Sequence, residues 1–186
     1  MVIGPEASCK STVFEALKAA MGDFSRTADS ETFLEGRFEQ AIRNDLARLH
    51  RARMVVASES AKGRRLASGL IKSITGGESI VSRFLRQEHF EHKPTWKLVL
   101  VTNFPPEISA NDAGLWRRVI RINFDRTIPE NERDPQIKRF LTDPDRGGPA
   151  VLAWMVQGCL MWQKDGLKIP PMIKKAAEDY REEYQK

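Results

Sequence analysis

The chain has 186 residues, of which 41% are hydrophobic and 30% charged, and its formal net charge is +5. This length suits one α/β domain with a helical tail, and the composition excludes both a disordered chain and a membrane protein, since no apolar run is long enough to span a bilayer. No secretory signal opens the sequence, so we expect a cytoplasmic location. Cys9 and Cys159 fit no metal-ligand spacing, and the positive charge alone does not decide whether a partner is polyanionic.

Apolar runs, glycines and prolines divide the chain into alternating strand-like and helix-like segments, which is typical of an α/β fold with a mostly parallel sheet. A short strand over residues 1–3 is followed by a loop over 4–10 and by a helix that Gly22 ends. A second helix is expected over Phe38–Leu49. A buried strand follows over Met54–Ala57.

A third helix is marked by apolar residues between Leu66 and Ile74, and we expect a hairpin after it. Its strands are predicted over Ile80–Phe84 and Trp96–Thr102, which leaves the polar stretch Arg86–Lys93 between them. The hairpin as a whole would then span roughly residues 83–97.

The last third of the chain begins with the loop that Pro105 and Pro106 impose. A strand is predicted over Val119–Phe124, followed by three helices over Ile137–Leu141, Ala150–Trp162 and Ile173–Tyr184. We therefore expect a core domain over residues 1–130 and a helical C-terminal segment over 131–186 that packs on it.

The loop after the first strand fits the phosphate-binding pattern G-x-x-x-x-G-K-[ST] at every fixed position except the second glycine, where Cys9 stands. A helix N-terminus follows, which offers unpaired N–H groups and a positive dipole end to phosphate oxygens. Lys10 would reach the β- and γ-phosphates, and Ser11 would bind magnesium. The alternative is an ordinary strand-to-helix turn. The predicted nucleotide-binding residues are Gly4, Pro5, Glu6, Ala7, Ser8, Cys9, Lys10, Ser11 and Thr12.

Cys9 is the flaw in this pattern. A glycine here lets the backbone approach the phosphates, whereas a side chain crowds the ligand and restricts the backbone. A left-handed conformation would cost a cysteine on the order of 1–2 kcal/mol. We therefore expect weakened nucleotide affinity.

Further polar residues follow the predicted strands. Glu59 ends the strand over 54–57, at the edge where α/β folds assemble ligand sites, and Asn103 repeats this position one strand later. They could hold magnesium and orient the attacking water, while Arg117 or Arg118 could neutralise charge on a transferring phosphoryl group. Taken singly, each has a plainer interpretation: a helix-opening carboxylate, a turn-forming asparagine or a solvated arginine.

The order of these segments resembles superfamily III helicases, specifically the helicase region of phage- and plasmid-type primases related to the poxvirus D5-type proteins. The resemblance rests on the following stretches: Lys10-Ser11-Thr12, Leu46-Ala47-Arg48-Leu49, Arg53 to Glu59, Gly63 to Leu66, Leu70-Ile71-Lys72, Thr75-Gly76-Gly77, Val101-Thr102-Asn103, Trp116-Arg117-Arg118, Leu152-Ala153-Trp154 and Gly158-Cys159-Leu160. It implies a P-loop NTPase fold of AAA+-like type, with a central sheet flanked by helices, a pre-sensor hairpin and a helical C-terminal tail.

The resemblance also implies roles. Lys10 and Ser11 form the Walker A pair, Glu59 is the Walker B carboxylate that shares magnesium with Ser11, Asn103 is the motif C sensor, and Arg117 is the preferred arginine finger. ATP and Mg²⁺ are the implied cofactors. The implied partners are DNA and further copies of the chain, in a hexameric ring whose hairpins grip DNA. Candidate DNA contacts are His89, His92 and Lys93, although a solvated hairpin tip is the plainer interpretation for each.

The sequence departs from the family pattern at Cys9 and at Ser58, where many ATPases carry a first acidic residue. We also expect a chain without the helical segment that precedes the loop in this family and without a primase domain. The sequence therefore predicts an ATP-dependent DNA helicase or translocase module of a phage or plasmid primase/helicase. The competing hypothesis is a degenerate remnant that binds DNA or protein with little ATPase activity. A small-molecule kinase is a third option, but it leaves the Trp-Arg-Arg segment and the hairpin unexplained.

Overall fold

The computed structural model describes residues 1–36, 43–58 and 62–183. Its centre is a five-stranded sheet in the order β2-β3-β6-β1-β7, in which every neighbouring pair is parallel. This confirms the mixed α/β architecture and the mostly parallel sheet. The strands are β1 (Val2–Ile3), β2 (Ser25–Asp29), β3 (Met54–Ser58), β6 (Lys97–Thr102) and β7 (Ile122–Asn123).

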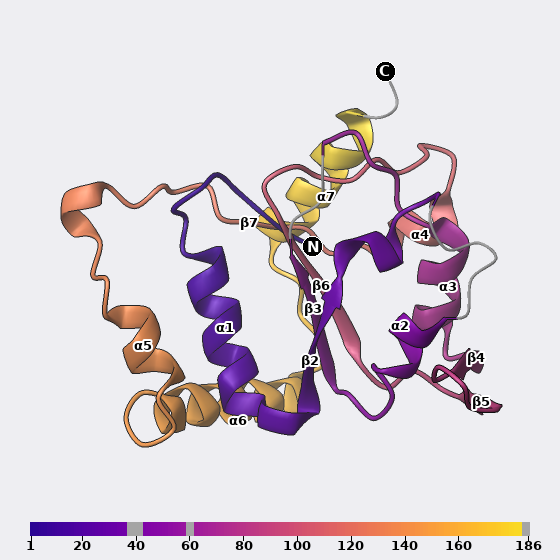
Figure 1. Cartoon of the computed structure of the whole chain (residues 1–186). Helices are drawn as coiled ribbons and strands as arrows, with labels where there is room; N and C mark the ends of the chain where they lie inside the picture. Colours follow the sequence, from indigo (N-terminus) through magenta and orange to yellow (C-terminus); the bar gives the residue numbers. More distant parts are fainter. Residues whose placement is uncertain (37–42, 59–61, 184–186) are drawn as a thin grey trace.

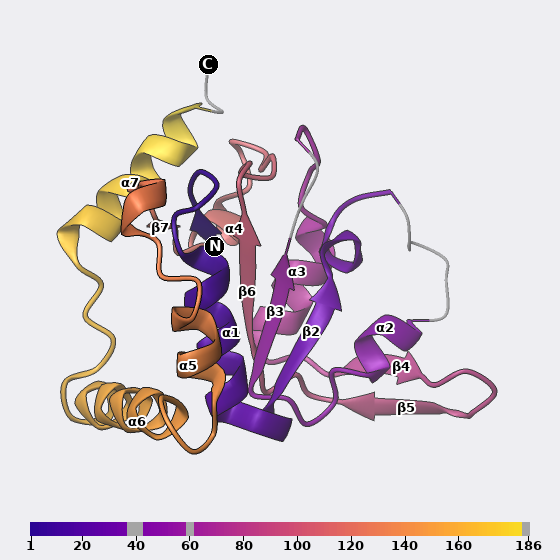
Figure 2. The same ribbon diagram turned by 60° about the vertical axis from the view of Figure 1, so that its left-hand side comes forward.

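Helices cover both faces of this sheet (Figures 1 and 2). On one face α1 packs against α5 and α6, whereas α2 and α3 lie on the other face, and α7 contacts β7. The α-helices are α1 (Lys10–Met21), α2 (Asn44–Ala47), α3 (Ser68–Gly76), α4 (Ala113–Trp116), α5 (Ile137–Thr142), α6 (Gly148–Asp165) and α7 (Pro171–Glu183). Short 3-10 turns are η1 (Gly22–Phe24), η2 (Ser30–Phe33) and η3 (Glu130–Glu132).

The strand β3 is apolar at successive positions because its side chains are buried on both faces of the sheet. Val55 and Ala57 belong to a core cluster on the α3 face, whereas Met54 and Val56 belong to a second cluster that packs against Phe14 and other residues of α1. Since successive side chains of a strand point to opposite faces, a strand covered on both faces needs apolar residues throughout. The predicted buried strand is therefore confirmed.

The hairpin differs from the prediction. The strand β4 (Ile80–Arg83) pairs antiparallel with β5 (His89–His92), and the segment 97–102 is instead β6 in the central sheet. The nearly uninterrupted apolar run of β6 suits burial on both faces, which the edge of a small hairpin does not offer. The turn of the hairpin is consequently residues 84–88, and the prediction that 86–93 lies between the paired strands is wrong.

The remaining predicted helices and strands agree with the structure to different extents. The predicted helix Phe38–Leu49 falls partly on residues outside the described part, and the described helical portion is α2. The predicted strand Val119–Phe124 shortens to β7, because its partner β1 offers only two residues to pair with. The three C-terminal helices are present as α5, α6 and α7, while the division into units 1–130 and 131–186 stays a prediction. Among the described residues, no helix is both long and apolar enough to cross a membrane.

Candidate functional site

The loop between β1 and α1 has an unusual backbone. Ala7 and Cys9 both have positive φ values, of 55° and 64°, and Cys9 is the residue from which α1 begins. Left-handed geometry is rare for residues with a Cβ, so both positions hold conformational strain. The side chain of Cys9 is exposed and provides no hydrogen bond to cap the helix. The backbone N–H groups of the first turn of α1 are therefore left for another acceptor.

Gly4 is required by close packing. A Cβ at this position would lie 2.2 Å from the carbonyl oxygen of Phe124, far inside contact distance. The backbone of Phe124 approaches here because its N–H donates to the carbonyl of Ile3 at 2.7 Å. The first glycine of the pattern thus allows the chain after β7 to lie directly against the loop.

Lys10 lies at the centre of the loop. Its Nζ donates to the carbonyl oxygens of Gly4 (2.6 Å) and Pro5 (2.5 Å) and to Oγ of Ser8 (3.0 Å). The residue is only 7% exposed, and burial lowers its pKa, an effect that the nearby Glu6 carboxylate opposes. In the described part of the chain no carboxylate lies within ion-pair distance of this ammonium. A buried cation with only neutral acceptors is a favourable place for an anion to bind.

A cavity of about 350 Å³ opens beside Lys10, within the size range of small-molecule sites. The register explains its position: Ser58 at the end of β3 lies opposite Val101, and Ile3 at the end of β1 lies opposite Thr102. The carboxyl ends of three parallel strands therefore meet at one edge, as in other α/β ligand sites. The cavity is lined by Glu6, Ala7, Ser8, Cys9, Lys10, Ser11, Thr12, Ser58, Val101, Thr102, Asn103 and Phe104.

The structure thus brings Lys10 and Asn103, predicted from separate segments, to one cavity. Glu59 lies outside the described residues, although Ser58 before it reaches the same cavity. Ser11 also lines the cavity and has an exposed side chain. Among the described residues, no group of three or more His, Cys, Asp or Glu could hold a metal ion, and magnesium binding by Ser11 and Glu59 stays a prediction.

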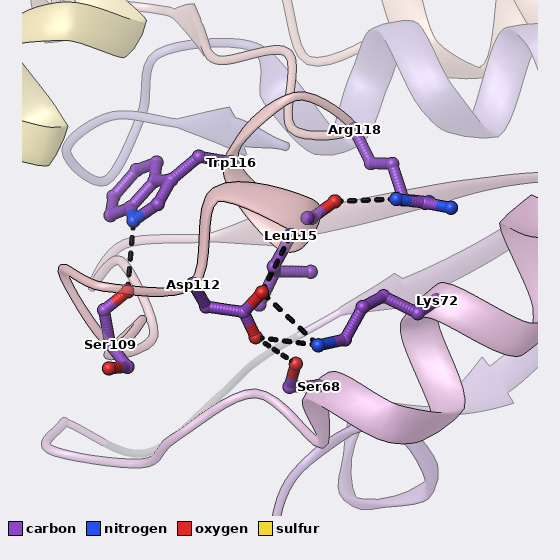
Figure 3. Close-up of polar contacts among 8 residues, drawn as sticks. Ser68, Lys72, Ser109, Asp112, Leu115, Trp116 and Arg118 are labelled. Atoms are coloured by element: carbon purple, nitrogen blue, oxygen red, sulfur yellow. Dashed lines mark hydrogen bonds and ion pairs between the residues drawn. The ribbon is translucent and has the colours of Figure 1, made fainter.

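The two arginines lie apart from this cavity. Arg117 follows α4 directly and is exposed, and within the described chain its guanidinium has no hydrogen bond or ion pair. Arg118 is half-buried, and its Nη1 donates to the carbonyl of Gly114 at 2.6 Å (Figure 3). Arg117 is consequently the more available of the two cations.

The hairpin residues proposed as DNA contacts fall into two groups. His89 and Lys93 are exposed, whereas His92 is 8% exposed and packs against Phe90 and His50, with ring centroids 5.1 and 4.9 Å away. Burial and then the neighbouring His50 lower the pKa of His92, which favours its neutral form. The expectation of an exposed His92 near a hairpin tip is therefore corrected, since His92 belongs to β5 and faces the body of the protein.

Two parts of this region were not predicted from the sequence as site residues. Thr102 and Phe104 line the cavity beside Asn103, and the hydroxyl of Thr102 accepts from the N–H of Phe104 at 3.1 Å. Asp112 forms a polar cluster with Ser68 and Lys72, which precede it by about 40 residues. Position at a strand end could have indicated Thr102, but no local pattern predicts the contacts of Asp112.

The fold and the cavity define an α/β domain whose candidate site lies at the carboxyl edge of a parallel sheet. The chain belongs to the protein family described as "Family of unknown function (DUF5906)", whose pattern matches residues 2–118. This range includes the loop, β3, the hairpin, β6 and α4.

Two viral proteins are among its relatives. The chain is 30% identical over 141 residues to a protein named "Putative helicase L207/L206" of Acanthamoeba polyphaga mimivirus, which covers 75% of this chain. It is 28% identical over 192 aligned positions to "Putative helicase 022R" of Frog virus 3 (isolate Goorha), which covers 93%. The chain spans only 15% and 19% of the lengths of these two proteins.

Solved structures of the NrS-1 C-terminal region in the apo state have a similar fold. One superimposes with a TM-score of 0.61 at 17% identity over 98% of this chain, and another with 0.60 at 14% identity over 96%. In both cases the similar part is 41% of the NrS-1 chain. At this low identity the likeness shows the fold.

Proposed function

We propose that the chain is the ATP-binding motor part of a replicative DNA helicase, with a P-loop NTPase fold of the superfamily III type. The observation that carries the proposal is the environment of Lys10. Among the residues that the structure describes, its buried ammonium has only neutral acceptors, and Lys10 stands at the N-terminus of α1 beside a cavity shared with Asn103. A triphosphate there would gain charge-assisted hydrogen bonds and the favourable end of the helix dipole.

In this proposal each residue has a role. On binding ATP, Lys10 exchanges the carbonyls of Gly4 and Pro5 for phosphate oxygens, and Ser11 with Glu59 holds the magnesium ion. Asn103 orients the attacking water from the end of β6. The magnesium ion would neutralise charge on the phosphates.

Movement along DNA is proposed to occur in a ring of identical subunits, with Arg117 of one subunit facing the nucleotide of the next. The exposed guanidinium of Arg117 suits a role across a subunit boundary. The helix α6 also exposes large apolar side chains, including Trp154 at 65% and Met161 at 66%. Exposed apolar side chains of this kind are typical of protein–protein interfaces. The names of the two viral relatives fit a helicase, and the hairpin with His89 and Lys93 would contact DNA phosphates.

A second candidate function is a remnant that binds DNA or protein but hydrolyses little ATP. Cys9 favours it, because the thiol lines the cavity from a left-handed position that a glycine would occupy without strain.

ATP turnover with and without single-stranded DNA separates the two candidates, measured on the chain, on Cys9→Gly and on Lys10→Ala as a control. A motor predicts turnover that DNA stimulates, that Cys9→Gly raises and that Lys10→Ala removes. DNA binding without turnover in either the chain or Cys9→Gly would support the remnant and exclude the motor.

A further inference from the structure

The single turn α4 carries Arg117 at its end. Contacts with α3, with the loop before α4 and with α7 hold α4 in place, and Figure 3 shows the first two of these. A four-residue helix has almost no stability of its own, because nucleation costs more than so few hydrogen bonds return. The position of Arg117 therefore depends on the contacts that α4 makes with its surroundings.

Asp112 provides the contact with α3. One carboxylate oxygen accepts from the N–H of Leu115 at 2.9 Å and so caps α4, and the same carboxylate accepts from the hydroxyl of Ser68. The ammonium of Lys72 lies 3.1 and 3.0 Å from its two oxygens. The Ser68 and Lys72 hydrogen bonds lower the pKa of the Asp112 carboxyl to about 2, so it is ionised at neutral pH.

Trp116 provides the other two contacts. Its indole N–H donates to the carbonyl of Ser109 at 2.9 Å, and its ring meets Tyr180 of α7 edge-on at 5.2 Å. Tyr180 is fully buried, and its hydroxyl donates to the carbonyl of Pro106. The loop from Asn103 to Asp112 is thus fixed at both Pro106 and Ser109 before α4 begins.

We infer that Asp112 is a positioning residue for Arg117. By tying the N-terminus of α4 to Ser68 and Lys72 of α3, Asp112 determines the position of the Arg117 guanidinium on the protein surface. This inference rests on the proposed function, in which that guanidinium acts on the nucleotide of a neighbouring subunit. Arg118 does not take this role, since its guanidinium donates back to Gly114 within α4.

The variant Asp112→Asn tests the inference, because the amide keeps an acceptor for the N–H of Leu115 but loses the charge that Lys72 pairs with. We expect DNA-stimulated ATP turnover to fall about tenfold, as displaced catalytic groups lose activity steeply, with unchanged affinity for ATP. The variant Lys72→Met leaves the Asp112 cap of α4 intact and should lower turnover in the same way. It replaces Asp112→Asn as the test if Asp112→Asn fails to fold. The matched control is Glu107→Gln in the same loop, because in the described part of the chain the Glu107 carboxylate makes no contact beyond an exposed ion pair of 3.8 Å with Arg65. It should keep wild-type turnover.

Mixed oligomers distinguish positioning of Arg117 from general damage. Lys10→Ala subunits have a disabled nucleotide site but an intact Arg117, so mixing them with Asp112→Asn subunits should restore turnover above that of either variant alone. The mixture of Lys10→Ala with Arg117→Ala is the reference. Rescue in the reference but none with Asp112→Asn would overturn the inference. No rescue in the reference would instead contradict the trans-acting arginine of the proposed function, and the inference would fail with it.

Discussion

Cys9 is the residue at which the loop departs furthest from what a bound phosphate requires. Its φ of 64° holds a Cβ in left-handed geometry at the first turn of α1. The strain costs about 1–2 kcal/mol. A glycine would relieve it, although glycine also loses about 0.5–1 kcal/mol of chain entropy on folding.

Replacing Cys9 by glycine should therefore stabilise the protein by about 1 kcal/mol and tighten ATP binding. Urea denaturation and a titration with fluorescent ATP measure the two effects. The control is Cys9→Ala, which keeps the Cβ and should leave the stability almost unchanged. Equal stabilities of the glycine and alanine variants would show that the left-handed backbone is not the cause.

His92 should make stability depend on pH. Its pKa is lowered in the folded protein, so below the ordinary histidine value of about 6.5 the unfolded chain binds a proton that the folded chain does not. Stability is thus highest above that pH and falls as the pH decreases.

The variant His92→Phe should lose part of this dependence, while His89→Gln, at an exposed position of the same strand, should keep it. Urea midpoints at pH 8 and pH 5.5 provide the comparison. A pH dependence identical in wild type and His92→Phe would rule out His92 as its source.

At the scale of elements, the hairpin illustrates what sequence patterns can and cannot predict. Hydrophobic periodicity correctly indicated the strands near 80–84 and 96–102, the helix after the loop and the C-terminal helices. It could not identify which strand pairs with β4, because pairing depends on contacts between distant segments. The run His89-Phe90-Glu91-His92 looks polar, yet it becomes a strand whose Phe90 stacks on Phe84 at 5.6 Å.

The corrected hairpin leads to a prediction for DNA binding. Lys93 is exposed just after β5, so Lys93→Gln should reduce the slope of log affinity against log salt by about 0.7 for single-stranded DNA. Lys138→Gln on α5, on the other side of the sheet, should leave the slope unchanged (Figures 1 and 2). Fluorescence anisotropy at several salt concentrations measures the slope. An equal reduction of the slope in both variants would mean that the hairpin does not contact DNA specifically.

At the scale of the whole molecule, parallel pairing explains how the candidate site assembles. The ends of β1, β3 and β6 meet at one edge, which places Lys10, Ser58 and Asn103 around a single cavity. The sequence predicted Lys10 from the phosphate-binding pattern of the loop, and Asn103 from its position after an apolar strand. Position at a strand end could have indicated Thr102 as well, but Phe104 could not be predicted, since its place beside the cavity depends on how the chain turns after β6. The contact between Asp112 and Lys72 could not be predicted from the sequence either. It forms only when α3 and α4, which the hairpin and β6 separate along the chain, pack together.

The central claim is that the loop around Lys10 binds the phosphates of ATP, and a titration of Mg–ATP by calorimetry tests it most directly. We predict saturable binding that Lys10→Ala weakens at least tenfold, by about 1.4 kcal/mol or more, because a charge-assisted contact is lost. The matched control Lys18→Ala, at the other end of α1, should bind ATP as the wild type does. Binding of equal affinity in the Lys10→Ala variant, or no binding to either the chain or its Cys9→Gly variant, would contradict the account.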